Sequence, residues 1–165
     1  MSDISVRLAE PTTEDIDAVA GLLVAIDNHY GVDPTPPLAA QIRHVEQRML
    51  GLGSSTYVGL GHFEGAPSGL ALFAPVHMGV DRGGIVFLKD LFVMPNARRK
   101  GLGRALMYLI ASVGADLGCS RIDFSVHPEN AAARALYDRL GGTGDPDRMY
   151  YLIGGDALEA LANDP

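Results

Sequence analysis

Hydrophobic and polar positions in the first half of the chain follow strand spacing first and helical spacing afterwards. Ile4, Val6 and Leu8 alternate with polar residues, which is typical of a strand with one buried face. Apolar residues then recur at helical spacing as far as Gly31, and a second amphipathic stretch follows the next loop. A short turn at 65–67 between two apolar stretches predicts a hairpin. The expected elements are strands at 4–8, 56–64 and 68–76 and helices at about 13–30 and 38–50.

The second half of the chain predicts a strand, a helix and a further strand in succession. The run Ile85–Met94 is apolar except for Lys89 and Asp90 and stops at Pro95, as a central buried strand does. A strand, a helix and another buried strand indicate a crossover with parallel pairing, so the pattern predicts a mixed α/β fold. The elements expected after Pro95 are a helix at Leu102–Leu117, a strand at Arg121–Val126, a helix at Asn130–Leu140, a strand at Met149–Ile153 and a short helix from Asp156.

Composition and charge narrow the classes of function. The 165 residues, 47% hydrophobic and 20% charged, are expected to form a single soluble domain, 1–165. Cys119 is the only cysteine, which excludes an internal disulfide framework and fits a cytoplasmic location. The net charge of −7 disfavours nucleic-acid and anionic-membrane partners. We expect no signal peptide, no membrane span and, since His44, His62 and His77 lack ligand spacing, no metal.

The most informative chemistry lies in a basic, glycine-containing loop before the helix that starts near 102. Its residues are Arg98, Arg99, Lys100, Gly101, Leu102, Gly103 and Arg104. The glycines let a ligand approach the main chain, and the free N–H groups of a helix start favour an anion. Four basic side chains make this site positive in an acidic protein. The spacing is neither the dinucleotide-binding pattern nor a P-loop. A specific phosphate-containing ligand and a solvated, nonspecific turn are the two interpretations.

The loop resembles the pyrophosphate loop of the GNAT superfamily of acetyl-CoA-dependent N-acetyltransferases. Arg98-x-x-Gly101-x-Gly103 matches the family pattern Gln/Arg-x-x-Gly-x-Gly/Ala. The segment Asn130-x-x-Ala133-x-x-Leu136-Tyr137-x-x-Leu140-Gly141 is similar to the second cofactor motif of that family. Residues 88–95 are similar to a strand of the spermidine/spermine and thialysine N-acetyltransferase group. The resemblance covers about 85–153, and upstream only the order of the elements agrees.

The resemblance implies a GNAT-type fold, with a mixed, mostly antiparallel central sheet of six to seven strands flanked by helices. A splayed parallel strand pair would hold acyl-CoA, with pantetheine bound like an added strand and the pyrophosphate on the N–H groups of 99–104. The residues implied to bind acetyl-CoA are Leu91, Phe92, Val93, the seven residues of the loop, Asn130, Ala133 and Tyr137. Because many relatives pair through C-terminal strands, we expect by analogy a homodimer that uses Met149–Ile153.

The implied reaction assigns Tyr137 and Asp90 to catalysis. A backbone N–H near Phe92 or Val93 would stabilise the oxyanion that forms when an amine attacks the thioester. Tyr137 is expected to protonate the leaving thiolate, and its alternative is a half-buried core tyrosine. Asp90, or a water that it holds, is one acceptor for the proton of the substrate ammonium.

The general base has further candidates. His127 is the alternative to Asp90, and His29 is a more distant one. Asp90 has a structural alternative as well, an ion pair with Lys89 or with an arginine across the sheet. The sequence therefore leaves the base open.

The acceptor is expected to be a primary amine of a small molecule, held by Tyr30, Lys89, Asp90 and His127. Lys89 departs from the polyamine-acetylating relatives, which usually carry an acidic residue at this position. This departure disfavours a polyamine and favours either a substrate carboxylate or a lysine that simply extends to the surface. The alternative functions are a noncatalytic acyl-CoA-binding regulatory module and a protein N-terminal or lysine acetyltransferase.

Overall fold

The computed structural model describes residues 4–78 and 83–163. Two compact units are present, Met1–Phe124, the first unit, and Ser125–Pro165, the second unit. The strands of the first unit are β1 (Ile4–Leu8), β2 (Tyr57–Phe63), β3 (Ala66–Val76), β4 (Gly84–Val93) and β5 (Cys119–Asp123). Its helical elements are α1 (Thr13–Tyr30), α2 (Leu38–His44), η1 (Val45–Met49), η3 (Pro95–Ala97) and α3 (Leu102–Asp116). The second unit contains α4 (Ala131–Arg139) and α5 (Asp156–Asn163).

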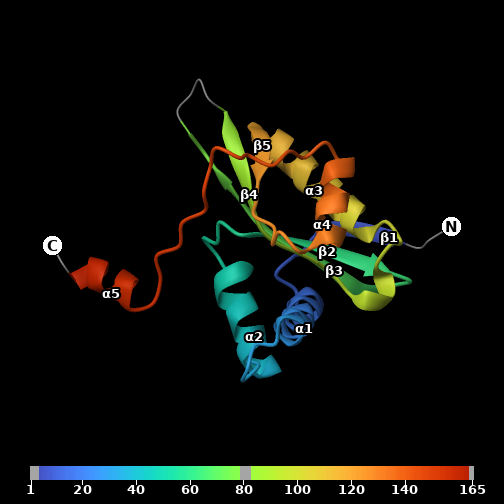
Figure 1. Cartoon of the computed structure of the whole chain (residues 1–165). Coiled ribbons are helices and arrows are strands. Elements are labelled where there is room, and N and C mark those ends of the chain that lie inside the picture. The colour runs from blue at the N-terminus through green and yellow to red at the C-terminus, as the bar shows by residue number, and fades with distance from the viewer. Residues whose placement is uncertain (1–3, 79–82, 164–165) are drawn as a thin grey trace. The chain divides into compact units, whose positions relative to one another are not determined.

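The five strands form one sheet in the order β1-β2-β3-β4-β5 (Figure 1). The pairs β1–β2, β2–β3 and β3–β4 are antiparallel, and β4–β5 is parallel. The mixed, mostly antiparallel sheet is confirmed, including the parallel crossover through α3. The strand number is corrected, because the described residues form five strands and not six to seven.

The missing strand is the one expected at Met149–Ile153 in the second unit. These residues are not assigned to a strand, and their side chains are 58–81% exposed. A short apolar segment becomes a strand only when another strand supplies backbone hydrogen bonds. None of the described strands pairs with this segment. The expected helix at 38–50 also differs, because it forms as α2 followed by the π-helical turn η1.

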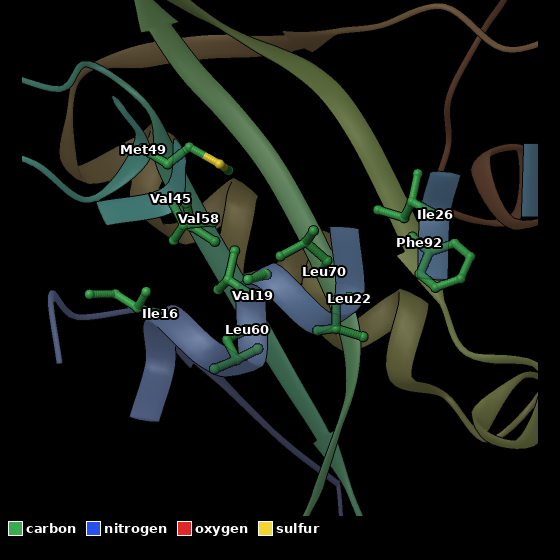
Figure 2. Packing of buried hydrophobic residues seen from close by; sticks show 11 residues of the cluster. Ile16, Val19, Leu22, Ile26, Val45, Met49, Val58, Leu60, Leu70 and Phe92 are labelled. Atoms are coloured by element: carbon green, nitrogen blue, oxygen red, sulfur yellow. The ribbon is translucent and has the colours of Figure 1, made fainter. Parts of the chain in front are cut away.

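Helices cover both faces of the sheet, with α1 and α2 on one side and α3 on the other (Figure 1). On the α1 face, side chains from the helices and from three strands form one apolar cluster (Figure 2). Its members include Ile16, Val19, Leu22, Ile26, Val45, Met49, Val58, Leu60, Leu70 and Phe92. This cluster holds the end of α1 against β4, where Phe92 lies.

Two glycines fix the start of α3 on the opposite face. A Cβ atom at Gly61 would lie 2.9 Å from Leu102 Cδ1, and one at Gly69 would lie 3.0 Å from Leu102 Cδ2. Only a residue without a side chain leaves room for this approach. Leu102 is the first residue of α3 and is 1% exposed. The packing of Leu102 therefore also fixes the position of the loop that precedes it.

An ion pair between half-exposed Arg7 and buried Asp15 connects β1 to the first turn of α1. Arg7 Nη2 donates to Asp15 Oδ1 at 2.6 Å, and the backbone N–H of Glu10 donates to Asp15 Oδ2 at 2.7 Å. Asp15 is 2% exposed. The hydrogen bond from Arg7 lowers the pKa of Asp15, although burial of the carboxyl acts in the opposite direction.

Candidate active site

The backbone of the basic loop contains two left-handed residues just before α3. Arg99 has a φ of 59° and Gly101 a φ of 97°, so both adopt left-handed conformations. Left-handed residues within a turn direct successive N–H groups into one concavity, and such strain concentrates at functional sites. Gly101 precedes α3 as its N-cap and supplies no side-chain hydrogen bond to the first turn. The N–H groups of that turn are thus available to a phosphate.

Two of the four basic side chains of the loop are already engaged within the protein. Arg98 Nε donates to the carbonyl oxygen of Val93 at 2.9 Å, so this side chain ties the loop to the end of β4. Arg104 Nε donates to Tyr108 Oη at 2.7 Å. Arg99 and Lys100 are exposed and make no side-chain hydrogen bond among the described residues. Arg98 and Arg104 therefore help to hold the loop in place, whereas the charges of Arg99 and Lys100 are not neutralised by any side chain in the described part of the chain.

The parallel strand pair separates halfway along β4. The ladder between β4 and β5 ends where Phe87 faces Asp123, which is why β5 stops three residues before the expected end at Val126. On its other side, β4 stays paired with β3 as far as Val93. The expected cofactor residues 91–93 lie in the stretch beyond the ladder. In a strand, alternate residues direct N–H and C=O groups to each side, so an extended ligand can bond to this edge.

A β-bulge brings Lys89 and Asp90 together. Leu72 faces Asp90 and Phe73 faces Leu88, so Lys89 is an additional residue on β4. Neighbouring side chains of a regular strand point to opposite faces, and a bulge changes this arrangement. Lys89 Nζ lies 3.4 Å from each carboxylate oxygen of Asp90. The ion pair that the sequence left as an alternative for Asp90 is present.

An aromatic side chain from α1 and a guanidinium from the loop both lie against Phe92. The ring centroid of His29 lies 5.7 Å from that of Phe92 and 5.2 Å from that of Tyr30. The Arg98 guanidinium lies 6.0 Å from the centroid of Phe92. His29 is hence much closer to the expected cofactor strand than the sequence indicated. Tyr30 is 66% exposed at the end of α1, beside His29.

A cavity of about 400 Å³ lies within the first unit, and Lys89 of the bulge is part of its lining. The lining residues that matter for its chemistry are Leu23, Gln41, His44, Met49, Phe87 and Lys89. They come from α1, α2, η1 and β4. Only Lys89 among them was predicted as a site residue, because residues that far apart in sequence show no common spacing. The sequence signal for Lys89 was its charge within an otherwise apolar strand.

The remaining predicted site residues lie in the second unit. Asn130 Oδ1 accepts a hydrogen bond from the backbone N–H of Ala133 at 3.1 Å, so Asn130 caps α4. His127 Nδ1 accepts from the backbone N–H of Glu129 at 3.2 Å, which occupies one of its two ring nitrogens. Tyr137 is half-buried on α4. The structure thus unites Lys89, Asp90, the 91–93 stretch and the loop in the first unit, and Asn130, Ala133 and Tyr137 on one helix of the second.

Two negative findings apply to residues 4–78 and 83–163. Within these ranges no group of three or more His, Cys, Asp or Glu side chains is arranged to hold a metal ion. Over the same ranges, no helix has the length and apolar character to cross a membrane.

Comparison with known families identifies the chain. The family model described as "Acetyltransferase (GNAT) family" matches residues 23–142, which is more than two thirds of the sequence. The protein belongs to the GNAT acetyltransferase family. The matched region contains both the 98–104 loop and α4.

Curated relatives are similar over shorter stretches. The aminoglycoside N(6')-acetyltransferase type 1 of Salmonella typhimurium is 30% identical over 63 residues, 38% of this chain and 43% of the relative. The thialysine N-epsilon-acetyltransferase of Mus musculus is 32% identical over 80 residues, 47% of each chain. The chain therefore spans less than half the length of these relatives.

Solved structures share the fold. An integron cassette protein from the mobile metagenome of V. cholerae superimposes with a TM-score of 0.86 and 21% identity, over 97% of this chain and 98% of the other. An aminoglycoside N-acetyltransferase in complex with CoA gives a TM-score of 0.69 and 19% identity, over 92% of this chain and 95% of the other.

Proposed function

We propose that the protein is an acetyl-CoA-dependent N-acetyltransferase that moves an acetyl group directly to a primary amine of a small molecule. The observation that carries this proposal is the loop 98–104, in which left-handed Arg99 and Gly101 precede the uncapped start of α3. A backbone of this kind suits a pyrophosphate. Membership of the GNAT family and a CoA complex among the structural neighbours support the same donor.

Acetyl-CoA would supply the acetyl group as a reactive thioester. The loop residues bind its phosphates, while the edge of β4 at Leu91, Phe92 and Val93 bonds to an extended chain of amides. Asn130 contributes by capping α4, which sets the direction of the helix that carries Ala133 and Tyr137.

Two groups of the chain act on the reacting atoms. A backbone N–H at Phe92 or Val93 donates to the carbonyl oxygen as negative charge develops on it, a kind of interaction that contributes about 3 kcal/mol per donor in other enzymes. Tyr137 donates its phenolic proton to the sulfur that departs.

The acceptor amine must lose a proton before it attacks. Asp90, or a water that it holds, accepts this proton, and His29 is the next candidate because its ring lies against Phe92. His127 is a weaker candidate, because its Nδ1 lone pair is used by Glu129. Tyr30, Lys89 and Asp90 are proposed to contact the acceptor, with His127 as a further contact.

Three broader properties belong to the same proposal. The two units form one catalytic domain, because the family match at 23–142 includes parts of both. The protein works in the cytoplasm, in keeping with its single cysteine, Cys119. It forms a homodimer in which the exposed apolar residues of Met149–Ile153 are covered, and sedimentation showing only monomer would refute this arrangement.

The test is the rate of CoA thiol release from acetyl-CoA, measured across a panel of amines. The panel contains polyamines, amino acids with a side-chain amine, aminoglycosides and short peptides. Release that depends on the amine, with the N-acetylated product identified by mass spectrometry, is the expected result. Binding of acetyl-CoA without release from any amine would instead support the noncatalytic module, and acetylation confined to peptides would support the protein acetyltransferase.

A further inference from the structure

The cavity beside β4 has a charge pattern that discriminates between amines. Its lining is mostly apolar, with Leu23, Met49 and Phe87 among the contributors. The ionisable side chains that line it are Lys89 and His44, and no carboxylate among the described residues lines it. The polar wall of this cavity is therefore cationic or neutral, although the protein carries a net charge of −7.

Two acidic side chains, Asp27 and Asp90, contact lining residues but do not line the cavity themselves. Asp27 Oδ2 accepts a hydrogen bond at 2.8 Å from Nε2 of Gln41, a lining residue. Asp90 is paired with Lys89. A polyamine or an aminoglycoside carries several ammonium groups, each of which needs a negative or strongly accepting neighbour when it leaves water. The lining does not provide several negative or strongly accepting groups of this kind.

Lys89 itself is available to an anion. Its side chain is 66% exposed, and its contact with Asp90 at 3.4 Å is a surface ion pair of the weak kind. As the additional residue of the bulge, it lines the cavity while Phe92 follows only three positions later. Three residues of strand span about 10 Å. An anionic group at Lys89 would thus lie within about 10 Å of an amine that approaches the end of β4.

We propose that the acceptor is an amine that also carries a carboxylate and an apolar body, with the carboxylate bound by Lys89 and the apolar body in the cavity. This assignment rests on the proposed function and specifies its substrate class. This substrate class differs from that of acetyltransferases whose acceptors are polycations, because here the charged group that recognises the acceptor, Lys89, is positive.

The test compares acceptors that differ only in the carboxylate. L-phenylalanine is matched with phenethylamine and L-lysine with cadaverine, and spermidine and neamine represent polycations. In the wild-type protein we expect kcat/KM for the better carboxylate-bearing acceptor to exceed that of its matched amine by about tenfold. Lys89→Met should abolish this preference by raising KM for the carboxylate-bearing acceptor, with kcat nearly unchanged. Lys89→Glu should reverse the preference, so that cadaverine becomes a better acceptor than L-lysine. Arg43→Met is the matched control, since Arg43 is an exposed cation of α2 outside the lining, and it should leave the ratio unchanged.

A binding measurement makes the outcome independent of turnover. Calorimetry with 3-phenylpropanoate, which has the carboxylate and the apolar body but no amine, should detect binding to the wild type and to Arg43→Met and about tenfold weaker binding to Lys89→Met. Equal kcat/KM for the matched acceptors, a polycation as the best acceptor, or unchanged binding in Lys89→Met would overturn the assignment while leaving the acetyltransferase intact. Loss of acetylation of every amine would overturn the proposed function itself.

Discussion

The two units of the molecule differ in how their apolar side chains are used. All side chains described as buried lie in the first unit, where Leu60, Leu70 and Leu106 are 0% exposed. Within residues 125–163 none is buried, and Leu152 is 81% exposed. The first unit therefore carries its own core, whereas the second has apolar side chains that its own helices do not cover.

This difference separates two kinds of functional contribution. The anion loop and the edge of β4 are backbone features held by a packed sheet, and rigid elements position groups better than loosely packed ones. The proposed acid, Tyr137, is a side chain on a nine-residue helix without buried residues. Donor binding should consequently depend on the first unit, and the rate of the chemical step should respond to the second.

The strongest test of the comparison is a charge placed in the loop. Gly103→Glu sets a carboxylate in the first turn of α3, where a phosphate is proposed to bind. An acidic residue is favourable to a helix start, so folding should be preserved, whereas like-charge repulsion should weaken acetyl-CoA binding by about 100-fold. Isothermal calorimetry measures the affinity, and circular dichroism checks the fold.

Gly21→Glu is the matched control for this change. Gly21 is an exposed helical glycine of α1 with nothing within 4 Å of an added Cβ. Its substitution should leave acetyl-CoA affinity unchanged. Equal affinities for the Gly103→Glu variant and the control would remove the loop from the donor site.

Much of the fold was predictable because it depends on local patterns. Alternation at 4–8 and the apolar run before Pro95 gave the correct strands, and helical spacing gave α1 and α3 nearly to the residue. Met149–Ile153 has the same local pattern but no partner strand among those described, and pairing is not encoded locally. The division of the helix at 38–50 into α2 and η1 was likewise not visible in its spacing.

The second test concerns how the first unit keeps its sheet and α1 together. Asp15→Asn leaves the Arg7 guanidinium without its charged partner, and we expect unfolding to become easier by about 2 kcal/mol at pH 7. Urea denaturation measures this loss. Asp145→Asn is the control in the second unit, because the pair between Asp145 and Arg148 is exposed on both sides and should contribute less than about 0.5 kcal/mol.

The contribution of the Arg7–Asp15 pair to the free energy of unfolding decreases at acidic pH. The hydrogen bond from Arg7 lowers the pKa of Asp15 in the folded protein. The stability from this pair is then complete above the unfolded pKa of about 3.9 and is lost as pH falls through the folded pKa. The gap between wild type and Asp15→Asn should be constant from pH 7 to about 5 and should shrink below about 4. A gap that stayed constant down to pH 3 would contradict the lowered pKa.

The candidate site was predictable only where its residues are adjacent in sequence. Glycines and basic residues fall within seven positions of the loop, so their joint chemistry was visible. The cavity lining comes from elements as distant as Leu23 and Lys89, and the bulge depends on the register between β3 and β4. Packing and register arise from pairing across the fold, which is why the contact of His29 with Phe92 was also unexpected.

The finest test addresses the contribution of the second unit. Tyr137→Phe removes the phenolic hydroxyl and keeps the ring that makes Tyr137 half-buried. We expect kcat for the best amine to fall about tenfold, less than the roughly 100-fold or more that is typical of general acid catalysis, because a thiolate departs with only partial help from a proton. Affinity for acetyl-CoA should change little, since the loop and the β4 edge are untouched. Tyr150→Phe, at an exposed tyrosine of the same unit, is the control and should keep the full rate. If kcat were the same in both variants, the proton for the departing sulfur would have to come from a group other than Tyr137 or from water, and Tyr137 would have no part in the chemical step.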